Sequence, residues 1–310
     1  MNRYDDFRPD VPALLASQER TLTPPNAAAR SGDGLGVGGR VASLARLYAL
    51  GLLVRLGLHR RLVYANLRLD WFREFQAYWV GELQNRAILP HDFFHLAGVY
   101  RQRLQTIESD LGSDASHLES WRDARTVSYL FSHTYRQALQ PLHVHRYARF
   151  LRRGSRVAEY GCGTAPILFA LARRYRHLDL ALVGADIPHL LFHFARWRFR
   201  DDRFVTMVSV NPSDDAALPG RYDTIFCLEV LEHLPRPLPV LRHFVDVLDP
   251  GGLLIFDYVR SEGKGLDTPT ALRDRDAALR FILNRFEIVQ GQVPTDGRDV
   301  APTVVRKRAH

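Results

Sequence analysis

The sequence predicts an α/β protein, with a doubly wound, seven-stranded and mostly parallel sheet that follows an all-helical N-terminal region. Three observations predict this fold class. Short apolar or β-branched runs alternate with helical patterns after Gly154, which is typical of a parallel sheet covered on both faces. A glycine-rich turn directly follows the first of these runs. Before Gly154, apolar residues recur at the three- and four-residue steps of helices.

The N-terminal region divides into a leader and a helical part. Residues 1–40 are expected to form a flexible leader, because 21–40 are rich in Pro, Gly, Ala and Ser. Residues 41–139 are expected to form a helical cap or substrate region, rich in aromatic side chains that serve as a core or as a lid over an apolar acceptor. The helical patterns cover about 41–58, 60–85 and 91–110, then a polar break at 111–116 and further helical sequence at about 119–151.

Residues 140–310 are expected to form the sheet domain. The strand-like runs cover about 156–160, 180–185, 204–210, 224–228, 253–257, 286–290 and 303–306. Helical patterns separate most of them, at about 164–177, 188–199, 236–248 and 268–284. Only a loop at 291–302 lies between the last two runs, so we expect a hairpin that brings one antiparallel strand into the sheet.

The chain is basic, with a net charge of +8, and its cations are 40 Arg and only 2 Lys. Arg binds phosphate and carboxylate groups well, which raises the alternative of a nucleic-acid partner. The positive charge is spread over both halves of the chain rather than gathered in a tail. A coding preference for Arg therefore explains the charge, and we do not expect a nucleic-acid partner.

Cysteine content and hydropathy limit the class of protein further. Cys162 and Cys227 are too few for a disulfide scaffold or a zinc ribbon, and they favour a reducing, cytoplasmic location. No uncharged apolar run reaches the length of about 18 residues that a membrane span needs. The apolar stripe at 41–58 is rimmed by Arg, which is compatible with weak membrane association or with a partner subunit.

The strongest motif is a Gly-x-Gly turn at the end of the first predicted strand, where Gly161 and Gly163 follow Glu159. Glycines let the backbone approach a ligand closely. A nicotinamide-binding loop would have a third Gly where this chain has Pro166. An acidic side chain before the turn would also repel a pyrophosphate. We therefore expect a cofactor with a cationic end.

Three further motifs follow. Asp186 ends the second predicted strand, where an acidic side chain can accept hydrogen bonds from ribose hydroxyls or cap the next helix. The segment at 222–235, YDTIFCLEVLEHLP, is a buried strand that runs into an acidic segment with a histidine. The segment at 248–255, LDPGGLLI, is a turn that leads into the next strand.

In this order, the four motifs resemble the class I S-adenosylmethionine-dependent methyltransferases, over about residues 140–310. The stretch at 222–237 is most similar to the ubiquinone-biosynthesis O-methyltransferases and their relatives that act on small molecules. The resemblance implies a Rossmann-like fold and a transferase. Such an enzyme moves a methyl group from S-adenosyl-L-methionine to an oxygen or nitrogen of a small molecule, such as a specialised metabolite, by in-line displacement. Loss of the methyl group converts the cofactor to S-adenosyl-L-homocysteine.

The resemblance also implies a cofactor site. Glu159 would lie near the ammonium group of the methionine end, Asp186 would bind the ribose hydroxyls, and Ile187 would lie against the adenine. Either Asn211 or Asp214 would lie near the adenine amine. The full implied set is Glu159, Tyr160, Gly161, Cys162, Gly163, Asp186, Ile187, Asn211, Asp214, Cys227 and Leu228.

An acceptor atom that holds a proton needs a general base, and His233 is the candidate, because an imidazole can take up a proton near neutral pH. The alternative is a structural histidine. Glu229, Glu232 and His233 together could also hold a divalent metal. We do not expect a metal here, because relatives that bind no metal have the same residue types at these positions.

Two other functions stay open on the sequence alone. The positive charge is compatible with an RNA-directed methyltransferase or an RNA-binding module. The motifs are also compatible with a cofactor-binding scaffold or a non-methylating enzyme on the same fold. The expected partner is a small-molecule substrate, and the apolar helical surface is compatible with a homodimer.

Overall fold

The structure is a computed structural model that describes residues 70–89, 93, 96–97, 113–121, 127–139, 141–211, 218–260 and 267–308. The predicted leader, the predicted helix at 41–58 and Asp214 lie outside the described residues. The chain divides into two compact units. One comprises Met1–Val99 and Thr134–Leu139, and the other comprises Tyr100–His133 and Gln140–His310.

Aromatic side chains form the core of the first unit. Its helix α4 (Asp70–Ala77) continues into the π-helix η3 (Tyr78–Glu82). Phe75 and Trp79 stack with their ring centroids 5.5 Å apart, and Phe93 meets Phe75 edge-on at 4.9 Å. All three side chains are buried. In this unit the aromatic residues therefore pack against one another, as a helical core requires.

The N-terminal helices differ from the prediction at one point. Helix α6 (Asp114–Ser120) begins inside the predicted polar break at 111–116, so 114–116 are helical. Asp114 lies in the first turn of that helix, where the helix dipole favours a negative charge. The helical sequence at 119–151 is divided into α7 (Val127–Leu139) and α8 (Pro141–Ala148). Pro141 is at the first position of α8 because proline lacks the N–H that a helix interior needs.

The second unit is built on a seven-stranded sheet with the order β3-β2-β1-β4-β5-β7-β6, which confirms the predicted fold class. The strands from β1 to β5 pair in parallel, and β7 is antiparallel to both of its neighbours, as the predicted hairpin requires. The strands are β1 (Arg156–Tyr160), β2 (Ala181–Asp186), β3 (Val205–Ser209), β4 (Tyr222–Cys227), β5 (Leu248–Tyr258), β6 (Phe286–Gln290) and β7 (Val300–Lys307).

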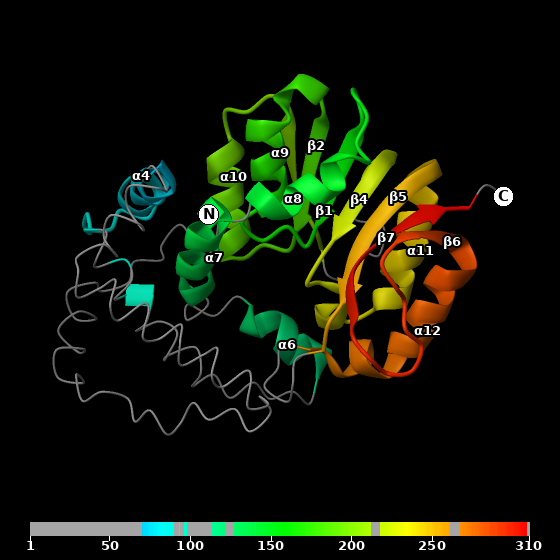
Figure 1. Cartoon of the computed structure of the whole chain (residues 1–310). Helices are drawn as coiled ribbons and strands as arrows, with labels where there is room; N and C mark the ends of the chain where they lie inside the picture. The colour runs from blue at the N-terminus through cyan, green and yellow to red at the C-terminus, as the bar shows by residue number, and fades with distance from the viewer. Residues whose placement is uncertain are drawn as a thin grey trace, which may run out of the picture. The chain divides into compact units, whose positions relative to one another are not determined.

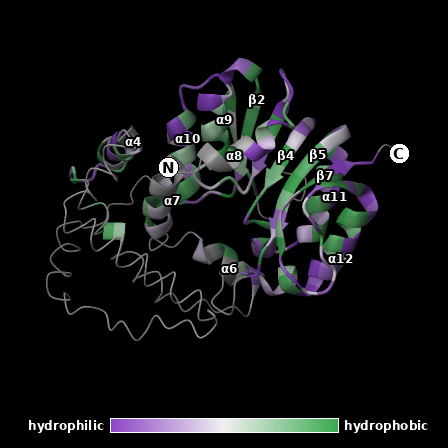
Figure 2. Cartoon of the chain, viewed as in Figure 1, coloured by the Kyte–Doolittle hydropathy of each residue, from purple (hydrophilic) through white to green (hydrophobic). Residues whose placement is uncertain are grey.

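Helices cover both faces of this sheet, with α8, α9 and α10 on one side and α11 and α12 on the other (Figure 1). Successive strand residues alternate between the two faces. Val157 and Phe226 belong to the core cluster beneath the first set of helices, and Ala158 and Ile225 to the cluster beneath the second. The hydrophobic stretches of the central strands are IFC at the end of β4 and LLIF within β5, and these parts are green in Figure 2. The remaining helical elements are α9 (Pro166–Arg174), η5 (Arg176–Leu178), α10 (Leu190–Phe199), η6 (Leu231–His233), α11 (Pro237–Val247) and α12 (Pro269–Arg285).

The strand order reverses between β1 and β4, and there the helices that follow the strands change from one face to the other. In open α/β sheets, ligands bind in the crevice at the carboxyl ends of the strands at such a switch point. The segments after β1, β2 and β4 meet at this edge. The fifth strand is longer than predicted, because the turn at 248–252 takes part in pairing with β4.

Within the described residues, no helix is long and apolar enough to cross a membrane.

Candidate functional site

The Gly-x-Gly turn is held tightly between the ends of β2 and β4. Gly161 has a φ of +66°, and its N–H donates to the carbonyl of Ala185 at 2.8 Å. A Cβ added to Gly161 would lie 2.8 Å from Cγ1 of Val230 and closer still to Cγ2. Gly163 has a φ of +51° and an N–H that donates to Asp186 Oδ2 at 2.6 Å. A side chain at Gly161 would therefore clash and strain the backbone.

Glu159 closes β1 and is fastened to the start of α9. Its Oε2 accepts the N–H of Leu168 at 2.9 Å, and its Oε1 accepts the N–H of Ile167 at 3.3 Å. These are among the N–H groups that a helix leaves unpaired in its first turn. The side chain is buried, and burial raises the pKa of Glu159 to about 8 despite these hydrogen bonds. The carboxyl group thus links the first strand to the helix that follows the turn.

Asp186 closes β2 and binds both neighbouring loops. Besides the N–H of Gly163, its carboxylate accepts the N–H of Ile187 at Oδ1, at 2.7 Å. The Nε2 of His189 lies 3.2 Å from the same oxygen. A carboxylate has about four acceptor positions, so the two backbone hydrogen bonds leave room for a ligand. Asp186 is buried with 9% of its surface exposed.

The end of β3 is attached to the same residue. The carbonyl of Asp186 accepts the N–H of Val210 at 2.8 Å, and the exposed Asn211 follows. Since Asp214 is outside the described residues, the choice between Asn211 and Asp214 stays open.

Two of the predicted residues have their side chains in the core. Tyr160 packs edge-on against Phe244 of α11, with ring centroids 5.1 Å apart. Cys162, inside the glycine turn, is also buried. Burial raises the pKa of the Cys162 thiol, and that of Cys227 at the end of β4, well above the usual value. Both cysteines therefore remain thiols at neutral pH.

The segment after β4 makes a strained turn. Glu229 has a φ of +58°, which is uncommon for a residue other than glycine and costs free energy. Its N–H donates to Asp257 Oδ1 at 2.7 Å. Asp257 lies near the end of β5, and burial raises its pKa to about 7. Leu228 is half-buried in front of this turn, and the side chain of Glu229 is exposed.

His233 lies between two buried carboxyl groups. Its Nε2 is 3.8 Å from Glu232 Oε1, and its Nδ1 is 3.8 Å from Asp267 Oδ1. Glu232 is only 1% exposed, and its Oε2 has no hydrogen-bond partner among the described residues. Burial raises the pKa of Glu232 to about 9, so it is protonated at neutral pH. An imidazole next to a carboxyl group can be oriented to accept a proton from a ligand.

Trp121 is brought to this site by a long-range anchor. The carboxylate of Asp114, at the start of α6, accepts the hydroxyl of Thr270 in α12 at 2.6 Å. Trp121 directly follows α6. Its ring centroid lies 5.6 Å from that of His233 and 6.2 Å from that of His189. Trp121 thus contacts the imidazoles after both β2 and β4.

The possible metal ligands Glu229, Glu232 and His233 are neighbours in this segment. However, no three His, Cys, Asp or Glu side chains within the described part of the chain are arranged to hold a metal ion. The expectation that this protein needs no metal stays a prediction.

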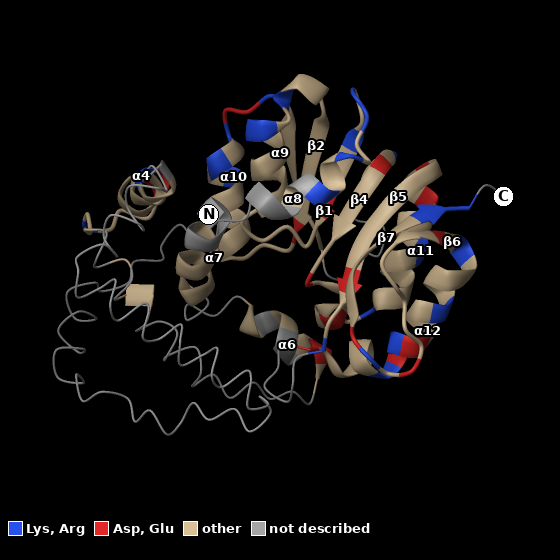
Figure 3. Cartoon of the chain, viewed as in Figure 1, with Lys and Arg blue, Asp and Glu red and all other residues tan. Residues whose placement is uncertain are grey.

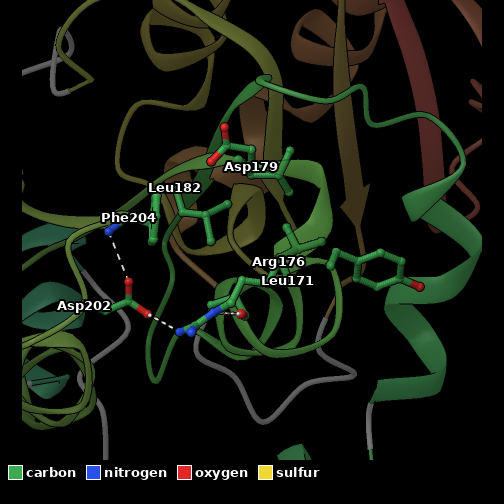
Figure 4. A pocket seen from close by; sticks show the side chains of 9 residues that line it. Leu171, Arg176, Asp179, Leu182, Asp202 and Phe204 are labelled. Carbon is green, nitrogen blue, oxygen red and sulfur yellow. Dashed lines mark hydrogen bonds and ion pairs between the residues drawn. The ribbon is translucent and has the colours of Figure 1, made fainter.

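The opposite edge of the sheet has a pocket lined by a different set of side chains. A shallow pocket at the amino ends of β2 and β3 is lined by Leu171, Leu182 and Phe204, and it contains an ion pair of Arg176 and Asp202 at 3.9 Å (Figure 4). Basic residues, coloured blue, lie on loops and helix ends near this edge (Figure 3). We assign the site to the carboxyl edge, because the glycine turn, Asp186 and the buried Oε2 of Glu232 lie there.

A comparison with known protein families shows to which family the chain belongs. A family model described as a methyltransferase domain matches residues 131–293, more than half of the chain. The chain belongs to this family. The match confirms the resemblance to the class I S-adenosylmethionine-dependent methyltransferases, because it covers the sheet from β1 to β6.

Individual relatives are more distant. The methyltransferase is 33% identical to a ubiquinone biosynthesis O-methyltransferase of Xanthomonas campestris pv. campestris over 109 residues, which is 34% of this chain and 44% of that protein. It is 27% identical to the ubiquinone biosynthesis O-methyltransferase of Xylella fastidiosa over 169 residues, which is 54% of this chain and 63% of that protein. An O-methyltransferase family protein from Burkholderia thailandensis has a TM-score of 0.47 at 14% identity, covering 70% of each chain. This chain thus spans about half the length of the curated relatives it matches.

The sequence motifs do not include His189, Trp121, Asp257 or Asp267. Asp257 had a usable signal, because it is an acidic residue at the end of a predicted strand, like Asp186. Trp121 had none, because its position depends on the contact between Asp114 and Thr270, which are 156 residues apart.

Proposed function

We propose that this methyltransferase transfers the methyl group of S-adenosyl-L-methionine to an oxygen or nitrogen atom of a small molecule. The proposal rests on the glycine turn at the switch point of the sheet. Asp186 accepts a hydrogen bond from this turn, and Val230 packs against it. An oxygen acceptor is the first choice, because the curated relatives are named as O-methyltransferases.

The residues at the carboxyl edge fit this cofactor. Val230 packs against Gly161 where a side chain would otherwise stand, which holds the turn at the carboxyl edge beside the proposed methionine end. Glu159 would lie near the ammonium group, Asp186 would use the acceptor position left on Oδ2 for the ribose hydroxyls, and Ile187 would lie against the adenine. The cofactor supplies a methyl group on a positively charged sulfur. A positive charge near Glu159 would favour its ionised form, which attracts that charge in turn.

On the acceptor side, His233 is the proposed base. The carboxyl groups of Glu232 and Asp267 flank its two ring nitrogens and would orient the imidazole. Trp121, in contact with the same ring, would exclude water and give the acceptor an apolar wall. Alignment of the acceptor atom with the methyl group and the removal of water supply most of the rate in such a displacement.

We also propose how the chain is divided into regions. Residues 140–310 would form the cofactor-binding domain, and 41–139 a helical cap that contributes to the substrate site after a leader at 1–40. A small-molecule substrate, a cytoplasmic location and a homodimer stay predictions. A metal is not required by the proposed reaction.

Calorimetric titration with S-adenosylhomocysteine tests the proposal. Asp186→Asn should weaken binding at least about tenfold, because a hydrogen bond to a charged group is replaced by a neutral one. Asp179→Asn is the matched control. Asp179 is an exposed residue on the loop before β2 with a φ of +52°, a conformation that Asn tolerates. A wild-type protein that does not bind the compound, or binding that Asp186→Asn leaves unchanged, would contradict the proposed function.

A further inference from the structure

His189 makes contacts on both sides of its ring. On one side, Nδ1 accepts the N–H groups of Leu191 at 3.2 Å and Phe192 at 3.4 Å, which caps the first turn of α10. On the other side, Nε2 lies 3.2 Å from Asp186 Oδ1. The residue therefore connects the start of a helix to the carboxylate that we propose as the ribose ligand.

The backbone hydrogen bonds determine where the proton of this imidazole resides. A neutral imidazole has one nitrogen with a proton and one without. Because Nδ1 accepts two N–H groups, it carries no proton in the neutral ring, and Nε2 does. The N–H of His189 is thus on the nitrogen nearest Asp186, so the contact between them is attractive.

The surroundings keep this ring in place. His189 is only 5% exposed, and the indole of Trp121 lies at a tilt of 35° with its centroid 6.2 Å away. Its backbone precedes α10 in an extended conformation, with φ of −152° and ψ of 172°. The imidazole is consequently fixed by its cap, by its burial and by an aromatic neighbour.

The effect on Asp186 is directional. Oδ2 accepts the N–H of Gly163 and Oδ1 that of Ile187. Both are backbone donors in the loops after β1 and β2. His189 adds a side-chain donor to Oδ1 from the N-cap of α10, a ten-residue helix packed on the sheet.

We propose that His189 is a positioning residue for cofactor binding, which orients the carboxylate of Asp186 toward the ribose through its Nε2–H. The inference rests on the proposed function and deepens it. It attributes part of the affinity for the ribose to a residue that does not touch the cofactor. The helix cap and the contact with Asp186 use different nitrogens, so two substitutions can separate them.

His189→Asn keeps the cap and removes the contact. Asn is a preferred N-cap residue whose side-chain oxygen can accept the same N–H groups. Its amide nitrogen is too close to that oxygen to reach Asp186. His189→Gln does the reverse, because its longer amide can donate to Asp186, while Gln is a poor cap.

Titration of the full chain with S-adenosylhomocysteine and thermal unfolding are the two measurements. His189→Asn should raise the Kd about tenfold and leave the Tm within about 1 °C of wild type. His189→Gln should lower the Tm by about 2–4 °C and change the Kd less than about threefold. A purely structural histidine would instead weaken binding in proportion to the loss of stability in both variants.

Ligand analogues that lack the 2′- or the 3′-hydroxyl sharpen the test. Wild type should bind the analogue without the hydroxyl recognised by Asp186 about tenfold more weakly than the parent compound, and His189→Asn should show a much smaller difference. Equal affinity of wild type and His189→Asn for the parent compound would overturn the inference and leave the proposed function intact. Failure of wild type to bind would instead reject the proposed function.

Discussion

The buried carboxyl groups at the ends of β1 and β2 differ from those after β4 and β5 in how they are bound. Glu159 and Asp186 each accept two backbone N–H groups. Asp257 accepts one from the strained Glu229, and Glu232 has an oxygen without a hydrogen-bond partner among the described residues. The proposed cofactor half is thus preorganised by the backbone. The proposed acceptor half has polar groups that a proton or a ligand must satisfy.

The largest expected effect tests the acceptor half. His233→Gln should lower kcat by about 10²–10⁴-fold, the usual contribution of a general base, and leave the Kd for S-adenosylhomocysteine unchanged. Activity would be measured as transfer of radiolabelled methyl groups from S-adenosylmethionine to a panel of small phenols, alcohols and amines. His177→Gln, an exposed histidine at the opposite edge of the sheet, should behave as wild type. A variant of His233 with full kcat would reject the base.

A pair of glycines tests the cofactor half. Gly161→Ala and Gly154→Ala both place a side chain at positive φ, +66° and +77°, which costs about 1–2 kcal/mol in each case. Only at Gly161 would the new methyl group overlap Val230, which adds about 1–3 kcal/mol. Urea unfolding should show this difference in stability. Cofactor binding should be lost in Gly161→Ala alone, and equal losses in both variants would contradict the assignment of the turn.

These comparisons also separate what the sequence could predict from what it could not. The bounds of β1 and β6 match the predicted runs, because an apolar or β-branched run begins where each strand begins. Gly163 and Asp186 are in contact, as two neighbouring strand ends should be. The contacts of His189 and Trp121 depend on long-range packing instead, and no local pattern indicates which ring nitrogen meets Asp186.

The buried carboxyl group of Glu232, whose Oε2 has no hydrogen-bond partner among the described residues, predicts a pH dependence of stability. Burial raises its pKa from 4.5 to about 9, so the folded state binds a proton that the unfolded state releases. Its contribution is therefore fully present below pH 4.5 and is lost as the pH rises toward 9. The Tm of wild type should fall over this range.

Glu232→Gln should flatten this profile, because a neutral amide replaces the group that must ionise. The variant should be more stable than wild type at the alkaline end. Glu287→Gln, an exposed residue in β6, should leave the slope unchanged. Thermal unfolding at intervals across the range measures both, and parallel profiles for wild type and Glu232→Gln would refute the raised pKa of the buried Glu232.

The smallest effect concerns Glu159, whose carboxyl group is well bound yet has a pKa of about 8. At pH 7.5 it is mostly protonated. An ammonium group placed near it would favour the ionised form, so cofactor binding should release a fraction of a proton. Calorimetry in buffers of different ionisation enthalpy measures that fraction. Glu159→Gln should abolish the release, and Glu232→Gln should keep it. Binding without proton release in wild type would place the ammonium group away from Glu159, against the other bound carboxylate, Asp186, or the backbone of the turn.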